Sequence, residues 1–141
     1  MIIREYVDTD HGDVIALWHR CGLTRPWNDP ATDLDLAVRG EQSTILVAEL
    51  NGGPVATVMV GFDGHRGWVY YLGVDPAHRR QGLARRLMRE AEQWLRARQA
   101  PKIQLMIRHD NTDAIGFYMA MGYQEQAVVT YGRRLDENDM T

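Results

Sequence analysis

The segment with the clearest chemical content is an arginine-rich turn in the middle of the chain. It reads Arg79-x-x-Gly82-x-Ala84 and follows a strand-like run that ends at Val74. The first backbone N–H groups of a helix have no partner within the helix, and the helix dipole adds partial positive charge there. A glycine at such a turn lets a bulky anion approach the backbone. The segment therefore predicts a pyrophosphate site, made by the backbone of Gln81, Gly82, Leu83, Ala84 and Arg85.

Neither of the two familiar phosphate-loop patterns occurs in this chain. There is no GxxxxGK[ST] segment, and there is no GxGxxG segment followed by an acidic residue. A glycine before a helix is also, on its own, often no more than a helix start. Taken alone, the Gly82 turn leaves both interpretations open.

Metal and thiol chemistry find little support in the sequence. The single cysteine, Cys21, allows no internal disulfide and is typical of a reducing compartment. It stands at the end of a predicted helix, where a lone cysteine is more often packed than nucleophilic. We expect no metal site, because no His-x-x-x-His spacing or Cys/His cluster is formed by His11, His19, His78 and His109.

The elements that must position the Gly82 turn follow from the hydrophobic periodicity. Alternation predicts strands, apolar spacing of three and four residues predicts helices, and Asn-Gly-Gly and Asp-Gly mark two hairpins. We expect strands over residues 1–7, 44–50, 54–62, 67–74 and 102–107, and a final strand or strand pair over residues 123–131 and those that follow. We expect helices from residue 10 to about residue 21, and over residues 33–39, 82–98 and 113–121. This order predicts a sheet with helices on its faces.

The composition indicates one soluble globular domain over residues 1–141. The chain is 45% hydrophobic with a formal net charge of −3, so it offers no basic field for nucleic acid. No stretch approaches the ~18 apolar residues that span a bilayer. Charges begin at Arg4, which predicts no signal peptide and a cytoplasmic location.

Two motifs in the same order resemble those of the GNAT superfamily of N-acetyltransferases. The Gly82 turn is similar to the family pattern [QR]-x-x-G-x-[GA], and residues 72–76 resemble its preceding L-x-V-x-P strand. The second motif, N-x-x-A-x-x-[FL]-Y-x-x-x-G-[FY], is matched by Asn111, Ala114, Phe117, Tyr118, Gly122 and Tyr123. The segments RPWNDP and GFDGHRG resemble the small bacterial YpeA-like group in particular.

This resemblance covers essentially the whole chain and implies an α/β (α+β) GNAT fold. The expected sheet is central, mixed and mostly antiparallel, with six to seven strands splayed between strands 4 and 5. About four helices should flank it. The fourth strand usually bulges at the L-x-V-x-P segment.

The resemblance also implies roles for individual residues toward acetyl-CoA. The backbone of Leu72 and Val74 would pair with the pantetheine arm as an added strand. Arg79 and Arg80 would contact the adenosine phosphates. Asn111 would bond to the pantetheine arm, and Tyr118 would lie near the acetyl sulfur. A phenol is protonated at neutral pH and can donate to a departing thiolate, so we interpret Tyr118 as the general acid.

The residue that takes the proton of the amine is less obvious. Many relatives carry a glutamate on the fourth strand, whereas this stretch, residues 68–71, reads WVYY. The nearest titratable groups are Asp63 and His65 in the preceding hairpin, and a histidine has a suitable pKa. A water relay through Tyr70 or Tyr71 is the alternative, and the hairpin groups can equally be a solvated turn.

The acceptor pocket is expected at the loop between the first two helices, which usually lines it in the family. Trp27, Asn28 and Asp29 offer an aromatic face, an amide and a carboxylate there, and Tyr71 can form a wall. One interpretation places Asp29 near the amine and Arg25 near a carboxylate of an amino-acid-like acceptor. The other is a rigid connection with Trp27 packed inward.

The sequence therefore predicts an N-acetyltransferase that moves the acetyl group of acetyl-CoA to a primary amine by direct attack. The acceptor is expected to be a small molecule or a peptide, and a homodimer is compatible with the fold. The alternatives are a protein N-terminal or lysine acetyltransferase and a non-catalytic module that binds acyl-CoA.

Overall fold

The computed structural model of the chain describes residues 1–136. The chain forms two compact units, of which the first is Met1–Met106 and the second begins at Ile107. The first unit holds all five strands and three of the four α-helices. It therefore contains the sheet and the Gly82 turn.

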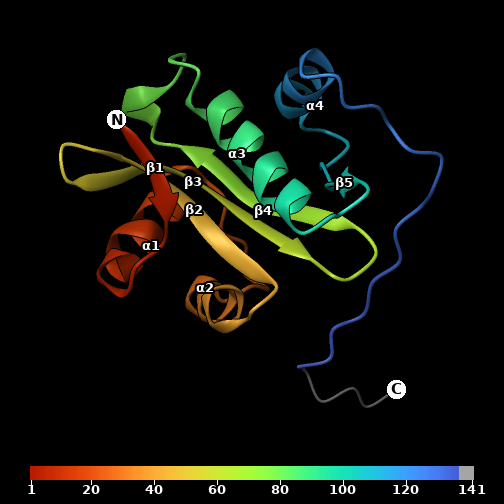
Figure 1. Cartoon of the computed structure of the whole chain (residues 1–141), viewed down its shortest axis with the longest axis horizontal. Helices are drawn as coiled ribbons and strands as arrows, with labels where there is room; N and C mark the ends of the chain where they lie inside the picture. Colours follow the sequence, from red (N-terminus) through yellow and green to blue (C-terminus); the bar gives the residue numbers. More distant parts are fainter. Residues whose placement is uncertain (137–141) are drawn as a thin grey trace. The chain divides into compact units, whose positions relative to one another are not determined.

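The sheet of the first unit has its strands in sequence order (Figure 1). Each of the first three neighbouring pairs is antiparallel, and β5 pairs with β4 in parallel. The expected mixed, mostly antiparallel sheet is thus confirmed. Its strands are β1 (Ile2–Glu5), β2 (Ser43–Leu50), β3 (Gly53–Phe62), β4 (Gly67–Val74) and β5 (Ile103–Gln104).

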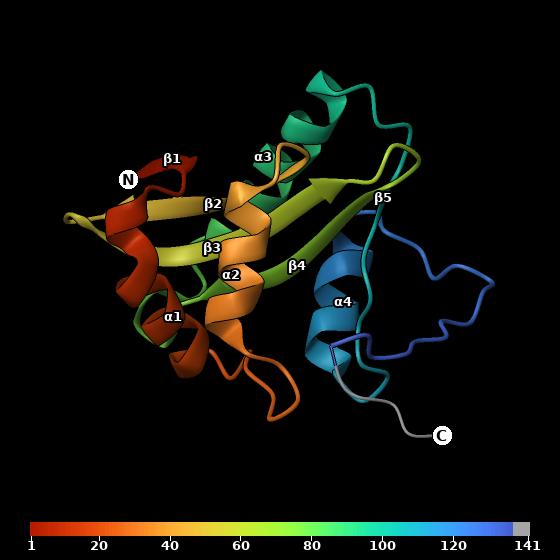
Figure 2. The same cartoon turned by 90° about the horizontal axis from the view of Figure 1, so that it is seen from below.

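Helices cover both faces of this sheet (Figures 1 and 2). On one face lie α1 (His11–Arg20) and α2 (Pro30–Arg39), and on the other lies α3 (Leu83–Ala97). Side chains of a strand alternate between the two faces, so each face acquires its own core. The first core contains Val14, Trp18, Leu34, Ala37, Ile45 and Val47. The buried face of α3 consists of Leu83, Leu87, Met88, Ala91 and Leu95.

The predicted helices start and end close to the observed ones, except at α2. The predicted start was Asp33, but α2 begins at Pro30. Asp29 is its N-cap and accepts a hydrogen bond from the N–H of Ala31 at 3.1 Å. An Asp followed by Pro is a favoured start because Pro lacks the N–H that would be unpaired there.

The prediction of six to seven strands is wrong, because the described residues contain five. The strand expected over residues 123–131 is not formed, and the one expected over 102–107 shrinks to β5. A strand needs an edge to pair with, and β-branched or aromatic content does not provide one. Val128, Val129 and Tyr131 are more than 70% exposed, so they lack the packing that stabilises a strand.

The second unit contains one helix, α4 (Thr112–Ala120). Asn111 is its N-cap and accepts a hydrogen bond from the N–H of Ala114 at 3.2 Å. In the described part of the chain, no helix has both the length and the apolar character needed to cross a bilayer.

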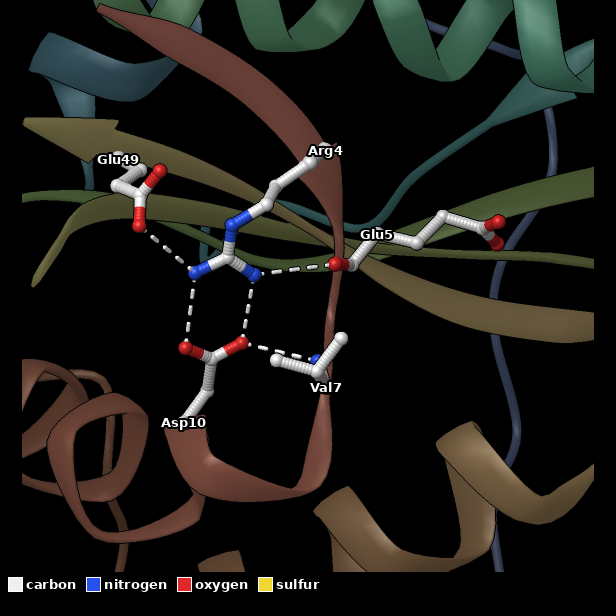
Figure 3. A network of polar contacts seen from close by, with 5 residues as sticks. All are labelled: Arg4, Glu5, Val7, Asp10 and Glu49. Carbon is white, nitrogen blue, oxygen red and sulfur yellow. Dashed lines mark hydrogen bonds and ion pairs between the residues drawn. The ribbon is translucent and has the colours of Figure 1, made fainter. Parts of the chain in front are cut away.

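An ion pair fastens β1 to the start of α1 (Figure 3). The Arg4 guanidinium donates to both oxygens of Asp10, at 2.7 and 2.9 Å, and lies 3.5 Å from Glu49 on β2. The N–H of Val7 adds a third donor to Asp10, at 2.9 Å. Asp10 is only 5% exposed, so its carboxylate loses hydrogen bonds to water on folding. The bonds from Arg4 and Val7 replace them.

Candidate active site

The fourth strand bulges where the sequence led us to expect it. Thr57 pairs with Gly73 and Met59 pairs with Tyr70, so Val58 alone lies opposite two residues, Tyr71 and Leu72. Tyr71 has a φ of 53°, in the left-handed region that favours glycine. A side chain kept in this region must be held there by its surroundings.

Three contacts hold Tyr71. Its ring stacks on Trp18 of α1, with centroids 3.9 Å apart and planes at 14°. Its hydroxyl donates to Asp33 of α2 at 2.6 Å. Its carbonyl accepts from the Thr57 hydroxyl at 3.0 Å, and that hydroxyl accepts from the Trp18 indole at 2.9 Å. Both sheet-covering helices of this face therefore fix the bulge.

Beyond the bulge, the outer edge of β4 has no strand beside it within the first unit. The pairing with β5 is confined to Gly67 with Ile103 and Trp68 with Gln104. The separation of strands 4 and 5 expected for the fold is therefore present. The backbone of Leu72 lies in the stretch that β5 leaves uncovered, while the carbonyl of Val74 accepts from Cys21 Sγ at 3.3 Å and Arg79 Nε at 3.4 Å.

Cys21 behaves as a packed side chain. Burial is the main cause that raises the pKa of its thiol, and a raised pKa disfavours the nucleophilic thiolate. A Cβ on the neighbouring Gly73 would come within 2.6 Å of the Leu23 side chain and 3.2 Å of Cys21 Sγ. A side chain at position 73 would therefore require Leu23 and Cys21 to shift.

The turn after β4 is anchored before it reaches Gly82. Asp75 accepts from the N–H of Ala77 at 3.0 Å and pairs with Arg20 of α1 at 2.8 Å. The Ala77 N–H and the Arg20 guanidinium both lower the pKa of Asp75, so it is ionised at neutral pH. A short 3₁₀ helix, Pro76–His78, follows.

The turn itself presents backbone donors. Arg80 and Gly82 have φ values of 63° and 77°, both left-handed, and Gly82 is the N-cap of the 15-residue α3. No side chain caps this helix, so its first N–H groups are left for water or a ligand. Left-handed residues beside a helix start form the concave nests that bind anions. The predicted donors, residues 81–85, thus span the Gly82 turn and the first residues of α3.

A cavity of about 570 Å³ lies beside the bulge, between α2 and strands β3 and β4. The predicted acceptor residues Asn28 and Tyr71 line it, and so does Asp33, which the sequence did not single out. The other lining residues are Leu23, Leu36, Ala37, Ser43, Met59, Val60, Gly61 and Tyr70. A mostly apolar hollow with a few polar groups is the usual form of a small-molecule site.

A second cavity of about 540 Å³ adjoins the first, since Ser43, Gly61 and Tyr70 line both. Its remaining lining comes from the β2 entry and the β3–β4 hairpin: Gly40, Glu41, Gln42, Phe62, Asp63 and Trp68. We refer to the two as the bulge cavity and the hairpin cavity.

The other predicted acceptor residues have local structural roles. Besides capping Ala31, Asp29 accepts from the Thr32 hydroxyl at 3.0 Å. Arg25 donates to the carbonyls of Gly22 and Thr24 at 2.8 and 2.9 Å. Trp27 is 55% exposed, which contradicts the alternative that it packs inward.

The two predicted proton acceptors lie in the β3–β4 hairpin. Asp63 accepts from the N–H groups of His65 and Arg66 at 2.8 and 2.7 Å, and from the Trp68 indole at 3.3 Å. These bonds, the Arg66 N–H first, lower its pKa and weaken it as a base. Asp63 lines the hairpin cavity and His65 lines neither cavity. The five strand steps from Gly67 to Leu72 span roughly 16 Å, which separates this hairpin from the bulge.

The second predicted motif belongs to the second unit. Tyr118 of α4 is 8% exposed and contacts Phe117 and Tyr123 edge-on, with centroids 5.0 and 5.6 Å away. Burial raises its pKa to about 12, so the phenol keeps its proton at neutral pH. Its role as acid, and the role of Asn111 toward the pantetheine arm, stay predictions.

Sequence reasoning missed Asp33 and Trp18 as parts of the site. The predicted helix over residues 33–39 places Asp33 at a helix start, and no pattern in the sequence pairs Trp18 with Tyr71. The Asp29-Pro30 pair would have moved the helix start upstream and left the Asp33 carboxylate without a capping role.

Comparison with known proteins shows to which family the chain is similar. A model described as the acetyltransferase (GNAT) family matches residues 10–123. The fold is similar to that of the apo aminoglycoside antibiotic 6'-N-acetyltransferase AAC(6')-IG from Acinetobacter haemolyticus, with a TM-score of 0.78 and 21% identity over 96% of this chain and 100% of that one.

Two further structures have coenzyme bound. A predicted acetyltransferase from Clostridium acetobutylicum, with acetyl-CoA, has a TM-score of 0.78 at 15% identity, covering 98% of this chain and 99% of that chain. The aminoglycoside N-acetyltransferase AAC(6')-Iy, with CoA, has a TM-score of 0.80 at 18% identity, covering 95% and 94%. With the bulge, the open strand edge and the Gly82 turn all in place, and with the family match over most of the chain, this protein belongs to the acetyltransferase (GNAT) family.

Proposed function

We propose that the chain is an N-acetyltransferase that moves the acetyl group of acetyl-CoA to a primary amine of a small molecule. The observation that carries this proposal is a juxtaposition within the first unit. The uncovered backbone of the β4 bulge leads through the short 3₁₀ helix Pro76–His78 into the Gly82 turn, and the bulge cavity opens beside the bulge. One ligand can thus place its phosphates at the turn and its acyl end at the cavity.

In the proposed reaction the amine nitrogen attacks the thioester carbonyl carbon. The C–N bond forms, the C–S bond breaks, and the amine loses one proton while the thiolate gains one. The N–H groups of residues 81–85 hold the pyrophosphate, Arg79 and Arg80 flank it, and the backbone of Leu72 and Val74 aligns the pantetheine arm. Holding both reactants in line supplies much of the rate in such direct transfers.

The proposed reaction needs a proton donor for the thiolate and an acceptor for the amine proton. Tyr118, with its pKa raised to about 12, is the proposed donor to the thiolate. Asp63 and His65 remain candidates for accepting the amine proton through water. The Tyr71 phenol is a poor base itself, because burial and the Asp33 carboxylate raise its pKa.

Calorimetric titration with acetyl-CoA, CoA and ATP tests the coenzyme site. We expect acetyl-CoA and CoA to bind and ATP to bind far more weakly. Gly82→Asp should abolish binding, since it places a negative charge at the proposed pyrophosphate position. Gly52→Asp is the matched control, because Gly52 also has a positive φ, 84°, and open space around it. Unchanged affinity in Gly82→Asp would mean that Gly82 is only a helix start, and equal loss in both variants would mean that the substitutions act through the fold.

Tyr118→Phe tests catalysis separately from binding. It should lower turnover by a factor of roughly 10² or more and leave acetyl-CoA affinity nearly unchanged, as expected for a general acid. If wild type binds acetyl-CoA but acetylates no amine, the chain is a binding module instead.

A further inference from the structure

Every side chain that is charged at neutral pH and lines the bulge or hairpin cavity is a carboxylate. Asp33 lines the first cavity, and Glu41 and Asp63 line the second. No lysine, arginine or histidine among residues 1–136 lines either one. The two cavities adjoin through three shared residues, so a single extended ligand meets both ends. We infer that the acceptor is an organic cation with at least two ammonium groups and no acidic group, an inference that rests on the proposed acetyl transfer.

Asp33, the carboxylate of the bulge cavity, has a neutral hydrogen-bond partner. Asp33 accepts one hydrogen bond from the Tyr71 hydroxyl, which is neutral and stays protonated. An ionised carboxylate offers about four acceptor positions, and the phenol occupies one of them. The charge of Asp33 is therefore available to an ammonium group, in a cavity whose other lining is largely apolar.

The hairpin cavity offers a second cation site of different make-up. The Asp63 carboxylate is oriented by the turn N–H groups and by the Trp68 indole, and Glu41 adds another negative charge. Phe62, Trp68 and Tyr70 bring aromatic rings to the same lining. Aromatic faces attract ammonium ions, and neighbouring carboxylates strengthen that attraction.

The spacing of the two ends favours a diamine with an apolar spacer. Tyr71, bonded to Asp33, and Trp68, bonded to Asp63, are three residues apart on β4, roughly 10 Å along a strand. The side chains between the two ends include Tyr70 and Ser43, with Met59 beside them. A methylene chain suits this lining.

In the described part of the chain, the absence of a cation from the lining of both cavities disfavours an amino acid or a peptide carboxyl end as the acceptor. Its carboxylate would face Asp33, Glu41 or Asp63 with no lining cation to neutralise it, and like charges at close range repel. Arg25, the cation of the neighbouring loop, donates to the carbonyls of Gly22 and Thr24. The amino-acid-like acceptor considered from the sequence therefore lacks its partner.

Three acceptors with one carbon skeleton test the inference. Pentylamine has one amine, 1,5-diaminopentane has two, and lysine adds a carboxylate to the diamine. We expect kcat/KM for the diamine to exceed that for pentylamine by about 10-fold, and that for lysine by 10-fold or more; 10-fold corresponds to about 1.4 kcal/mol. A series from 1,4-diaminobutane to 1,8-diaminooctane then locates the preferred spacing.

Variants assign the effect to the cavities. Asp33→Asn and Asp63→Asn should each reduce the preference for the diamine over pentylamine to about 3-fold or less. Asn keeps one acceptor oxygen, which suffices for the Tyr71 hydroxyl at position 33 and for the two turn N–H groups at position 63. The bond from the Trp68 indole to the second oxygen of Asp63 is lost in Asp63→Asn. Asp35→Asn is the matched control on α2, because Asp35 lines neither cavity.

The outcomes separate this inference from the proposed function. Transfer to lysine or pentylamine that equals or exceeds transfer to the diamines overturns the inference and leaves the acetyltransferase proposal standing. A diamine preference that survives in both cavity variants also overturns it. No transfer to any of these amines, with acetyl-CoA bound, counts against the proposed function and removes the inference with it.

Discussion

Two carboxylates on the same face of the sheet, the buried Asp10 and the half-buried Asp33, have opposite kinds of partner. Asp10 receives two hydrogen bonds from the Arg4 guanidinium and one from the Val7 N–H. Asp33 receives one from the neutral Tyr71 phenol. The negative charge of Asp10 is neutralised by the positive charge of Arg4, whereas Asp33 has no charged partner among its hydrogen bonds within residues 1–136. A cancelled charge fastens elements together, whereas an uncancelled charge in a cavity is available to a ligand.

The pKa values follow the same division. The Arg4 guanidinium is the main cause that lowers the pKa of Asp10, and Asp10 in turn raises the pKa of Arg4. At the bulge, burial first and Asp33 second raise the pKa of the Tyr71 phenol. Arg4 and Asp10 therefore form an ion pair, whereas the partner of Asp33 is a neutral phenol.

The largest expected effect comes from removing Arg4. Arg4→Met keeps much of the side-chain volume but leaves the Asp10 carboxylate buried without a counter-charge. Breaking a buried ion pair costs 3–5 kcal/mol, and because Arg4 is a quarter exposed we expect about 3 kcal/mol in the free energy of unfolding. Urea denaturation followed by circular dichroism measures it.

A double variant sharpens this first prediction. Arg4→Met combined with Asp10→Asn removes both charges, and it should recover part of the loss because no ion is left unpaired. A double variant less stable than Arg4→Met alone would show that packing, and not the lone charge, dominates at this site.

The pH dependence of stability separates the two carboxylates next. The pKa of Asp10 is lowered in the folded state, so its pairing stabilises above its unfolded pKa of about 4 and is lost as pH falls through the folded value. Arg4 contributes no pH dependence near neutrality, because both of its pKa values lie far above it. Wild type should therefore lose stability below about pH 4, and Asp10→Asn should lose less over the same range. Parallel curves would contradict the assignment.

At the bulge, the expected effects shift from stability to turnover. Asp33→Asn keeps the oxygen that accepts the Tyr71 hydroxyl, so the free energy of unfolding should fall by no more than about 1 kcal/mol. It removes the uncancelled charge, so kcat/KM for a cationic amine should fall roughly 10-fold with acetyl-CoA affinity unchanged. A large loss of stability with unchanged kcat/KM would show that Asp33, like Asp10, has a structural role and does not bind the amine.

The sequence predicted the Gly82 turn and the start of α3 but not the contacts that surround the bulge cavity, for a physical reason. The Gly82 turn is local, because its glycine and the start of α3 are consecutive in the chain. The Asp33–Tyr71 bond joins residues 38 positions apart, and the Trp18 stack and the Thr57 bond likewise depend on how the helices dock. The prediction of a last strand over residues 123–131 was wrong for the same kind of reason. Its β-branched and aromatic residues are typical of strands, but no strand edge in the described part of the chain pairs with them.

The smallest expected effect belongs to Asp35, two residues from Asp33 on the same helix. Its side chain is 60% exposed and lies 3.5 Å from His11, which is itself 44% exposed. Exposed pairs of this kind stabilise by 0–1 kcal/mol, so Asp35→Asn should change the free energy of unfolding by no more than about 0.5 kcal/mol and leave kcat/KM unchanged. The same Asp→Asn substitution is thus made at positions 33 and 35, which differ in whether the side chain lines the bulge cavity. If Asp35→Asn lowered kcat/KM for diamines as much as Asp33→Asn, the cation preference would arise from the overall field of the molecule and not from the cavity.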